Sequence, residues 1–360
     1  MKKDFIFGSD HYLHLKYIDD FKQKVKKYGE VVLSHHNQKN AVYPVFFHWI
    51  IALFFYDIAK NSPKKINQFI FFISYISFNL FLVFYYKEID FIFFIKANFL
   101  FGIFPFSYVF WNAKNRGISP REIGLLIGQI FLYVLFFYLL NPTFYLFSLL
   151  VLIAFLALIT SQFANQYIIF LSLILSVERG DIQFIFIPFL SGVFFYLMFP
   201  KLAVSFFKGQ FFHKLNYSKY LAPIFILNIR PSIYRDFFYD FWKKLKNFRK
   251  NKIETINYIY TNPLIEILYG FPFLWILIWF SFNKPINPLS IHFWELILIT
   301  ISIFFLTSLK KTRFLGEPQR YLEFIIPLIV VQYISIIENS ILWWSAGIVT
   351  FFIFIQQLMI

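Results

Sequence analysis

Long apolar runs recur along almost the whole chain and limit its fold more than any other feature. Many of them approach the ~20 residues that a helix needs to cross a lipid bilayer, and they contain few charges. Of the 360 residues, 59% are hydrophobic and 15% are charged, whereas about 25% are charged in an average soluble domain. The sequence therefore predicts an all-α fold, a polytopic transmembrane helical bundle of about 10–11 spans.

The apolar runs form one predicted membrane domain, residues 43–360. Two short spans on either side of Ser161 predict a re-entrant hairpin within it. A long basic stretch, residues 201–261, predicts a loop on the cytoplasmic side. The predicted spans are residues 43–59, 66–86, 91–111, 123–140, 144–160, 163–177, 182–199, 263–282, 291–309, 322–337 and 341–360.

Residues 1–42 form a polar head in front of the membrane domain. Within this head, residues 8–28 predict an amphipathic helix that lies at the membrane interface rather than crossing the bilayer. The side chains expected on its apolar face are Tyr12, Leu15, Ile18 and Val25.

The formal net charge of +15 comes from basic residues that cluster between the apolar runs. Lys and Arg hold loops in the cytoplasm, so Lys60, Lys64 and Lys65 predict that the first loop is cytoplasmic. With the spans above, the head is then extracytoplasmic, and we expect the inner (plasma) membrane of a bacterium. We predict membrane lipids as partners and no nucleic acid, although a basic loop can also bind nucleic acid or anionic lipid.

The head and the first residues after it carry an unusual concentration of ionisable side chains, and residues 7–48 hold five of the seven histidines in the chain. Asp10 and His14 are four residues apart in D-H-Y-L-H and therefore share a helix face. A carboxylate beside an imidazole can act as a general base. The same groups, with His35 and His36, could instead bind a divalent metal ion, or they could be incidental polar residues of a hydrated helix. The chain has no cysteine, which excludes disulfides, thiolate metal sites and thiol catalysis.

The segment NAVYPVFFHW begins the first apolar run. Pro44 is typical of the first turn of a helix, and His48 follows one turn later among apolar residues. A polar side chain there is costly without a partner, so His48 is either functional or bonded to a neighbouring group within the protein.

A third polar segment, RFLGEPQRYLEFIIP, precedes an apolar run near the C-terminal end of the chain. Glu317 and Arg320 are three residues apart and can pair on one helix face. Arg320 beside Tyr321 at a membrane boundary favours a phosphate clamp, because a guanidinium binds phosphate oxygens bidentately. An ion pair at the membrane surface is the alternative.

Taken in order, these three segments resemble the C-type (GT-C) superfamily of bacterial membrane glycosyltransferases. That superfamily includes protein O-mannosyltransferases, lipid A aminoarabinose transferases and oligosaccharyltransferases. Its catalytic Asp in the first extracytoplasmic loop matches Asp10 in GSDHYLHLKYI, and its Tyr-Pro and His-Trp helix start loosely matches the segment from Tyr43 to Trp49. Its Arg-Tyr-Leu pattern, with a Pro some residues on, matches Arg320, Tyr321, Leu322 and Pro327.

The resemblance implies transfer of a sugar from a polyprenyl-phosphate donor to a cell-envelope acceptor, as in polysaccharide biosynthesis. It makes Asp10 the catalytic residue, lets Arg320 hold the donor phosphate, and has Glu317 orient Arg320. A divalent metal ion remains open as a cofactor. The residues expected to bind substrate are His11, His14, His35, His36, Tyr43, His48, Glu317, Arg320 and Tyr321.

Two other classes of function fit the same composition. A flippase or transporter of lipid-linked sugars also has many helices, but it needs charges along its path through the membrane. Charges within the predicted spans are few, chiefly Lys96, Glu266 and Glu295. A membrane assembly subunit without catalytic activity is the other alternative.

Overall fold

A computed structural model describes residues 9–24, 44–86, 90–103, 117–216, 271–281, 288–309 and 318–336, with a few single positions between them. Every regular element in these residues is a helix, so the predicted all-α fold is confirmed for the described part of the chain. The chain divides into two compact units, Met1–Gln210 and Phe211–Ile360.

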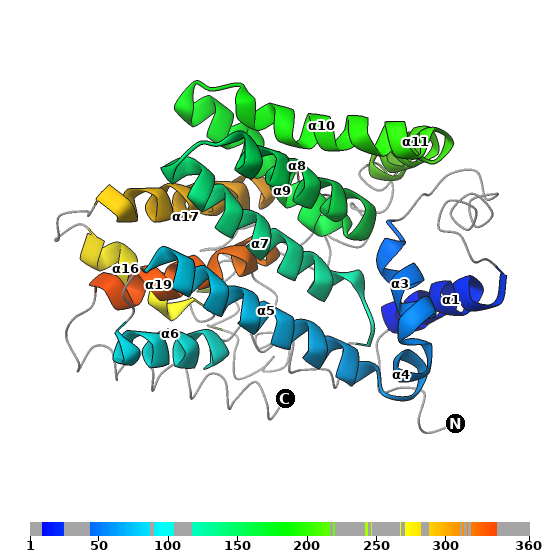
Figure 1. The fold of residues 1–360 in the computed structure, drawn as a ribbon, viewed down its shortest axis with the longest axis horizontal. Coiled ribbons are helices and arrows are strands. Elements are labelled where there is room, and N and C mark those ends of the chain that lie inside the picture. The colour runs from blue at the N-terminus through cyan, green and yellow to red at the C-terminus, as the bar shows by residue number, and fades with distance from the viewer. Residues whose placement is uncertain are drawn as a thin grey trace. The chain divides into compact units, whose positions relative to one another are not determined.

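Unit 1 contains a short N-terminal helix, two short helices after it, and a series of longer apolar ones (Figure 1). The last helix of the series continues past the boundary of the unit. Its helices are α1 (Ser9–Lys24), α3 (Phe46–Phe54), α4 (Tyr56–Asn61), α5 (Pro63–Tyr85), α6 (Phe91–Ile103), α7 (Pro120–Leu140), α8 (Phe144–Thr160), α9 (Gln162–Arg179), α10 (Gln183–Met198) and α11 (Pro200–Asn216).

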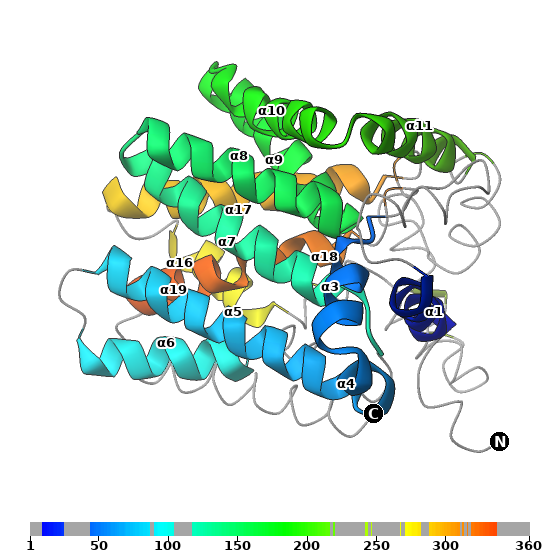
Figure 2. The same cartoon turned by 45° about the vertical axis from the view of Figure 1, so that its right-hand side comes forward.

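Helices α5 and α7 to α10 pack side by side as a bundle, as both views show (Figures 1 and 2). Aromatic rings fill its interior; those of Phe81 in α5 and Tyr133 in α7 stack with their centroids 4.5 Å apart. A buried hydrogen bond of 2.7 Å from Ser74 Oγ to Gln129 Oε1 also joins these two helices. Apolar burial thus supplies most of the packing in the bundle, with single polar links between helices.

The ends of the bundle helices follow local signals in the sequence. Ser119 caps α7 by accepting the backbone N–H of Arg121, and Pro120 occupies the first helical position, where its missing N–H costs nothing. At the other end of the bundle, Gly180 closes α9 in the left-handed conformation, at φ 64°, which glycine adopts without strain.

Two helices among the described residues, α5 and α7, are long and apolar enough to cross a membrane by length and composition. Shorter apolar helices cover Phe91–Ile103, Phe144–Thr160, Gln183–Met198 and Ile291–Thr307. The bundle of about 10–11 membrane spans that the sequence predicts is therefore not confirmed and stays a prediction.

The predicted first span, residues 43–59, is not a continuous helix. Helix α3 is nine residues long, the backbone turns at Phe55 (φ −132°, ψ 22°), and α4 adds only six residues. Nine residues rise only about 13 Å, well short of the bilayer. The segment thus stays at one end of unit 1, so the head helix and the lysines after α4 lie at that same end. Their predicted separation by a membrane span is wrong.

Unit 2 is described in part, through α16 (Pro272–Ser281), α17 (Pro288–Thr307), α18 (Gln319–Leu322), the 3₁₀ helix η4 (Glu323–Ile325) and α19 (Ile326–Ile336). Helix α19 packs against both α16 and α17. The rings of Phe273 in α16 and Tyr333 in α19 meet edge to face, with centroids 4.8 Å apart. This unit is therefore also an apolar helical assembly.

Candidate functional site

Helix α1 docks on α3 through a narrow buried face at one end of unit 1. The buried residues are His11, His14, Ile18 and Phe21, and their spacing places them on one helix face. Tyr12, which the hydrophobic pattern assigns to the apolar face, is exposed instead. The pattern failed because two of the residues that carry the contact are histidines, which a hydrophobicity scale counts as polar.

The buried face contains a direct contact between two imidazoles. His14 Nδ1 and His48 Nε2 are 2.8 Å apart, and the rings stack with centroids 5.0 Å apart. One of these nitrogens must donate a proton and the other must accept it. The rings of Tyr17 and Phe47 contact His48 edge-on. A costly polar side chain in an apolar helix is thus satisfied by a partner 34 residues away.

His11 joins α1 to the start of α7. Its Nδ1 accepts the backbone N–H of Ile118 at 3.0 Å, so the ring proton must be on Nε2 and the imidazole is neutral. Burial lowers the pKa of His11 below its ordinary value of 6.5, because burial disfavours the charged form. The imidazole therefore serves here as a hydrogen-bond acceptor.

Gly117 makes this contact sterically feasible. A Cβ atom at this position would overlap the imidazole of His11, so only glycine lets the ring approach the backbone so closely. Asn67 in α5 donates to the Gly117 carbonyl at 3.5 Å. Sequence reasoning missed Gly117, since a lone glycine before a helix gives no sign of what packs against it.

Glu122, in the first turn of α7, is a second residue that sequence reasoning missed. Its side chain is buried, and Ser119 Oγ donates to its Oε2 at 2.6 Å. The signal was present, because Ser and Glu three residues apart at a helix start are typical of a capping box.

A second cluster of polar groups surrounds Tyr56 in α4. The Tyr56 hydroxyl donates to Asp19 Oδ1 of α1 at 2.8 Å. This hydrogen bond is the main cause that raises the pKa of Tyr56. The ammonium groups of Lys22 and Lys60 lie 5.5 and 5.8 Å from the centroid of its ring. We refer to α1, α3, α4 and residues 117–119 together as the polar end of unit 1.

The structure brings together three of the predicted site residues: His11, His14 and His48. Asp10 lies in the first turn of α1, but its side chain is outside the described part. The other predicted site residues lie outside the described part of the chain: His35, His36, Tyr43 and Glu317.

Arg320 and Tyr321 lie in unit 2, on α18. The Tyr321 side chain is buried, and its hydroxyl donates to the Leu315 carbonyl at 3.3 Å. The hydroxyl of Tyr321 is therefore bonded within the protein. Binding of phosphate by Arg320 stays a prediction.

Among the described residues, no group of three or more histidine, cysteine, aspartate or glutamate side chains is placed to hold a metal ion. The predicted metal ligands His35 and His36 are outside that part. No known protein family, no curated protein and no solved structure matches this chain.

Proposed function

We propose that this chain is an integral membrane protein with many spans. The exposed surface of α5 supports this proposal, because it carries large apolar side chains along its length: Phe72 is 60% exposed and Phe84 is 72% exposed. Phe144, at the start of α8, is 86% exposed. Apolar surface on this scale is unfavourable in water and is expected against lipid. With 23 residues, α5 is about 35 Å long, which matches the hydrocarbon thickness of a bilayer.

The activity that we propose is sugar transfer of the GT-C kind, at the polar end of unit 1. One structural observation carries the proposal: the His14–His48 contact fixes the helix that bears Asp10 at the end of the apolar bundle. A catalytic carboxylate must be held in place to act, and a helix anchored at both His11 and His14 provides that. The resemblance of the surrounding segment to GT-C enzymes supplies the chemistry.

In the proposed reaction, the Asp10 carboxylate removes the proton from an acceptor hydroxyl. The acceptor oxygen forms a bond to the anomeric carbon of the sugar, while the bond from that carbon to the donor phosphate oxygen breaks. Polyprenyl phosphate leaves with the electron pair of the broken bond. Direct attack by the acceptor inverts the configuration of the sugar.

The three buried histidines are positioning residues in this account. His14, His48 and His11 are occupied by contacts within the protein, so they hold α1 rather than bind substrate. For Arg320 and Glu317, which belong to unit 2, the phosphate role and the orienting role rest on the resemblance alone. Sugar transfer of the GT-C kind requires the polar end to lie on the extracytoplasmic side of a bacterial inner membrane. This placement opposes the positive-inside rule, by which Lys60, Lys64 and Lys65 at the same end favour the cytoplasm.

The experiment that tests this function is the substitution Asp10→Asn, assayed for transfer of a radiolabelled sugar from polyprenyl phosphate in membranes. Asn keeps the shape of the side chain and loses the proton acceptor, so transfer should fall about 10²–10⁴-fold. Asp57→Asn is a matched control, because Asp57 is exposed on α4. Near-normal transfer by Asp10→Asn, with normal membrane insertion, would remove Asp10 from the mechanism and the proposal with it.

A further inference from the structure

Five lysines at the polar end and in the adjoining first turn of α5 are exposed and have no carboxylate partner among the described residues. They come from α1, α4 and the first turn of α5, and Asp57 is the exposed acidic residue beside them. Like charges gathered in one place repel each other and attract anions. We refer to these residues as the lysine face: Lys16, Lys22, Lys60, Lys64 and Lys65.

Two of these lysines are held close together by one aromatic ring. Lys22 of α1 and Lys60 of α4 both approach the ring of Tyr56, whose quadrupole attracts cations. Asp19, three residues before Lys22 on α1, accepts the Tyr56 hydroxyl instead. The ring therefore gathers positive charge at this point, and the geometry leaves both ammonium groups at the surface for an outside anion.

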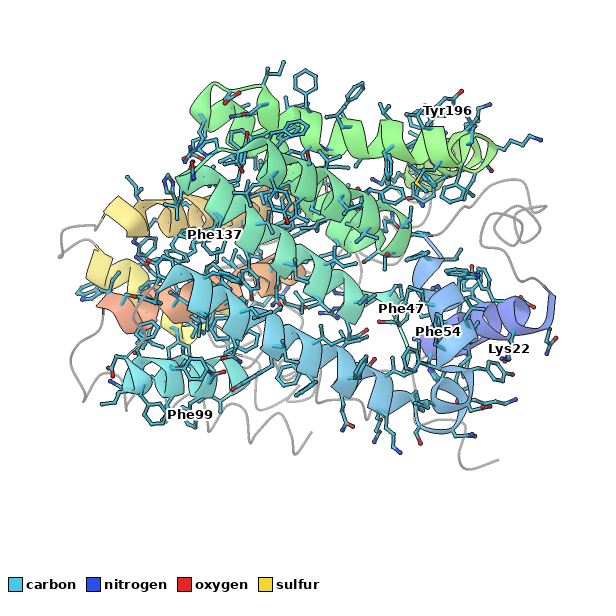
Figure 3. The ribbon with its side chains drawn as sticks, viewed as in Figure 1. Lys22, Phe47, Phe54, Phe99, Phe137 and Tyr196 are labelled. Carbon is cyan, nitrogen blue, oxygen red and sulfur yellow. The ribbon has the colours of Figure 1, made fainter. Side chains whose placement is uncertain are left out.

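Large apolar side chains border the lysine face. Phe54, at the end of α3, is 72% exposed, and it lies at the same end of unit 1 as Lys22 (Figure 3). Along α5, Lys64 and Lys65 are followed by exposed Phe69 and Phe72. From Lys64 to Phe69, five residues of helix rise about 7.5 Å. Along the axis of α5, the two lysines are therefore separated from the exposed phenylalanines by about the thickness of a lipid headgroup layer.

We propose that the lysine face binds the phosphate groups of anionic phospholipids in the adjacent leaflet, with Lys22 and Lys60 as its centre. Charge complementarity and the order of lysines before apolar side chains select this partner. Lysine stems pack along apolar surface while their ammonium groups reach the headgroups. The proposal is independent of sugar transfer, because it needs only that unit 1 lies in a bilayer.

The test uses the full chain, purified in a neutral detergent and titrated with phosphatidylglycerol or phosphatidylcholine. Bound lipid is counted by native mass spectrometry. A lysine near an anionic surface contributes about fivefold to binding, so the preference for phosphatidylglycerol should fall about 25-fold in the double variant Lys22→Gln/Lys60→Gln. The matched control is Lys201→Gln/Lys208→Gln, which removes two exposed lysines of α11 and should keep the preference.

Three results would overturn the proposal. The first is an unchanged preference in the Lys22→Gln/Lys60→Gln protein, given normal helicity and elution. The second is an equal loss in the α11 control, which would make net charge the cause. The third is full displacement of the lipid by millimolar inorganic phosphate, since the site would then recognise free phosphate rather than a lipid surface.

Discussion

The polar end of unit 1 and the bundle behind it are held together in different ways. Neighbouring bundle helices pack against each other along their length, chiefly through apolar rings such as those of Phe81 and Tyr133. The polar end instead depends on a few polar side-chain contacts, of His14 with His48 and of His11 with the backbone of Ile118. The polar end should therefore open as a local unit, while the bundle unfolds only with the whole of unit 1.

Two glycines, one in each region, test this difference most strongly. A Cβ at Gly124 in α7 would overlap the side chain of Ser161, where α9 begins, and a Cβ at Gly117 would overlap His11. Overpacking of this kind costs about 1–3 kcal/mol. Gly124→Ala should therefore lower the denaturation midpoint of the whole of unit 1. Gly117→Ala should leave that midpoint unchanged and expose α1 to protease.

Limited proteolysis and thermal unfolding in detergent, on the same samples, separate these outcomes. The comparison fails if Gly117→Ala lowers the unfolding midpoint as much as Gly124→Ala does. Gly180→Ala is unsuitable as a control, because Gly180 has a positive φ and would be strained for a different reason.

The contact between His14 and His48 should show a coupling free energy of its own. In a double-mutant cycle with His14→Phe and His48→Phe, residues in direct contact couple by about 0.5–3 kcal/mol. The measurement is hydrogen exchange of α1 in the four proteins. Additive effects of the two substitutions would mean that the imidazoles pack without bonding.

Acidification should favour opening of the polar end and leave the stability of the bundle unchanged. Since the pKa of His11 in the folded state is below 6.5, the stabilisation from neutral His11 is fully present above pH 6.5. It is lost as the pH falls from 6.5 through the lowered pKa. Opening of α1 should then increase by up to about tenfold per pH unit, for one proton taken up.

Hydrogen exchange of α1 between pH 7.5 and 5, corrected for its intrinsic pH dependence, measures this effect. His11→Gln is the matched variant, because the glutamine carbonyl can still accept the Ile118 N–H and does not titrate. An equal pH dependence in His11→Gln would assign the effect to another group.

The two regions also differ in how far the sequence predicts them. The predicted span 144–160 coincides with α8, and 182–199 differs from α10 by one residue at each end, because caps and glycine bound each apolar run. The break at Phe55 was not predictable, since no proline or glycine marks it. It follows from tertiary contacts of Tyr56 with Asp19 and Lys22.

The candidate site could be predicted only as a set of residue types. The concentration of histidines in the head pointed to His11 and His14, and a polar side chain in an apolar run pointed to His48. The structure brings these three together where α1 packs on the rest of unit 1. Their partners could not be predicted, because hydropathy carries no information on which polar group bonds to which. Gly117 became visible only once His11 was placed against it.

The most direct test is the sidedness of the polar end, because the account needs α1 and the α4–α5 junction on one side of the membrane. The chain has no cysteine, so single cysteines at Gln23, Ser62 and Asn141 can be probed with a membrane-impermeant thiol reagent in intact cells. We predict that Gln23→Cys and Ser62→Cys both react from outside, and that Asn141→Cys, at the far end of α7, reacts only after permeabilisation. Reaction of Gln23→Cys and Ser62→Cys from opposite sides would contradict the fold of the polar end, and reaction of both only from inside would contradict the proposed sugar transfer.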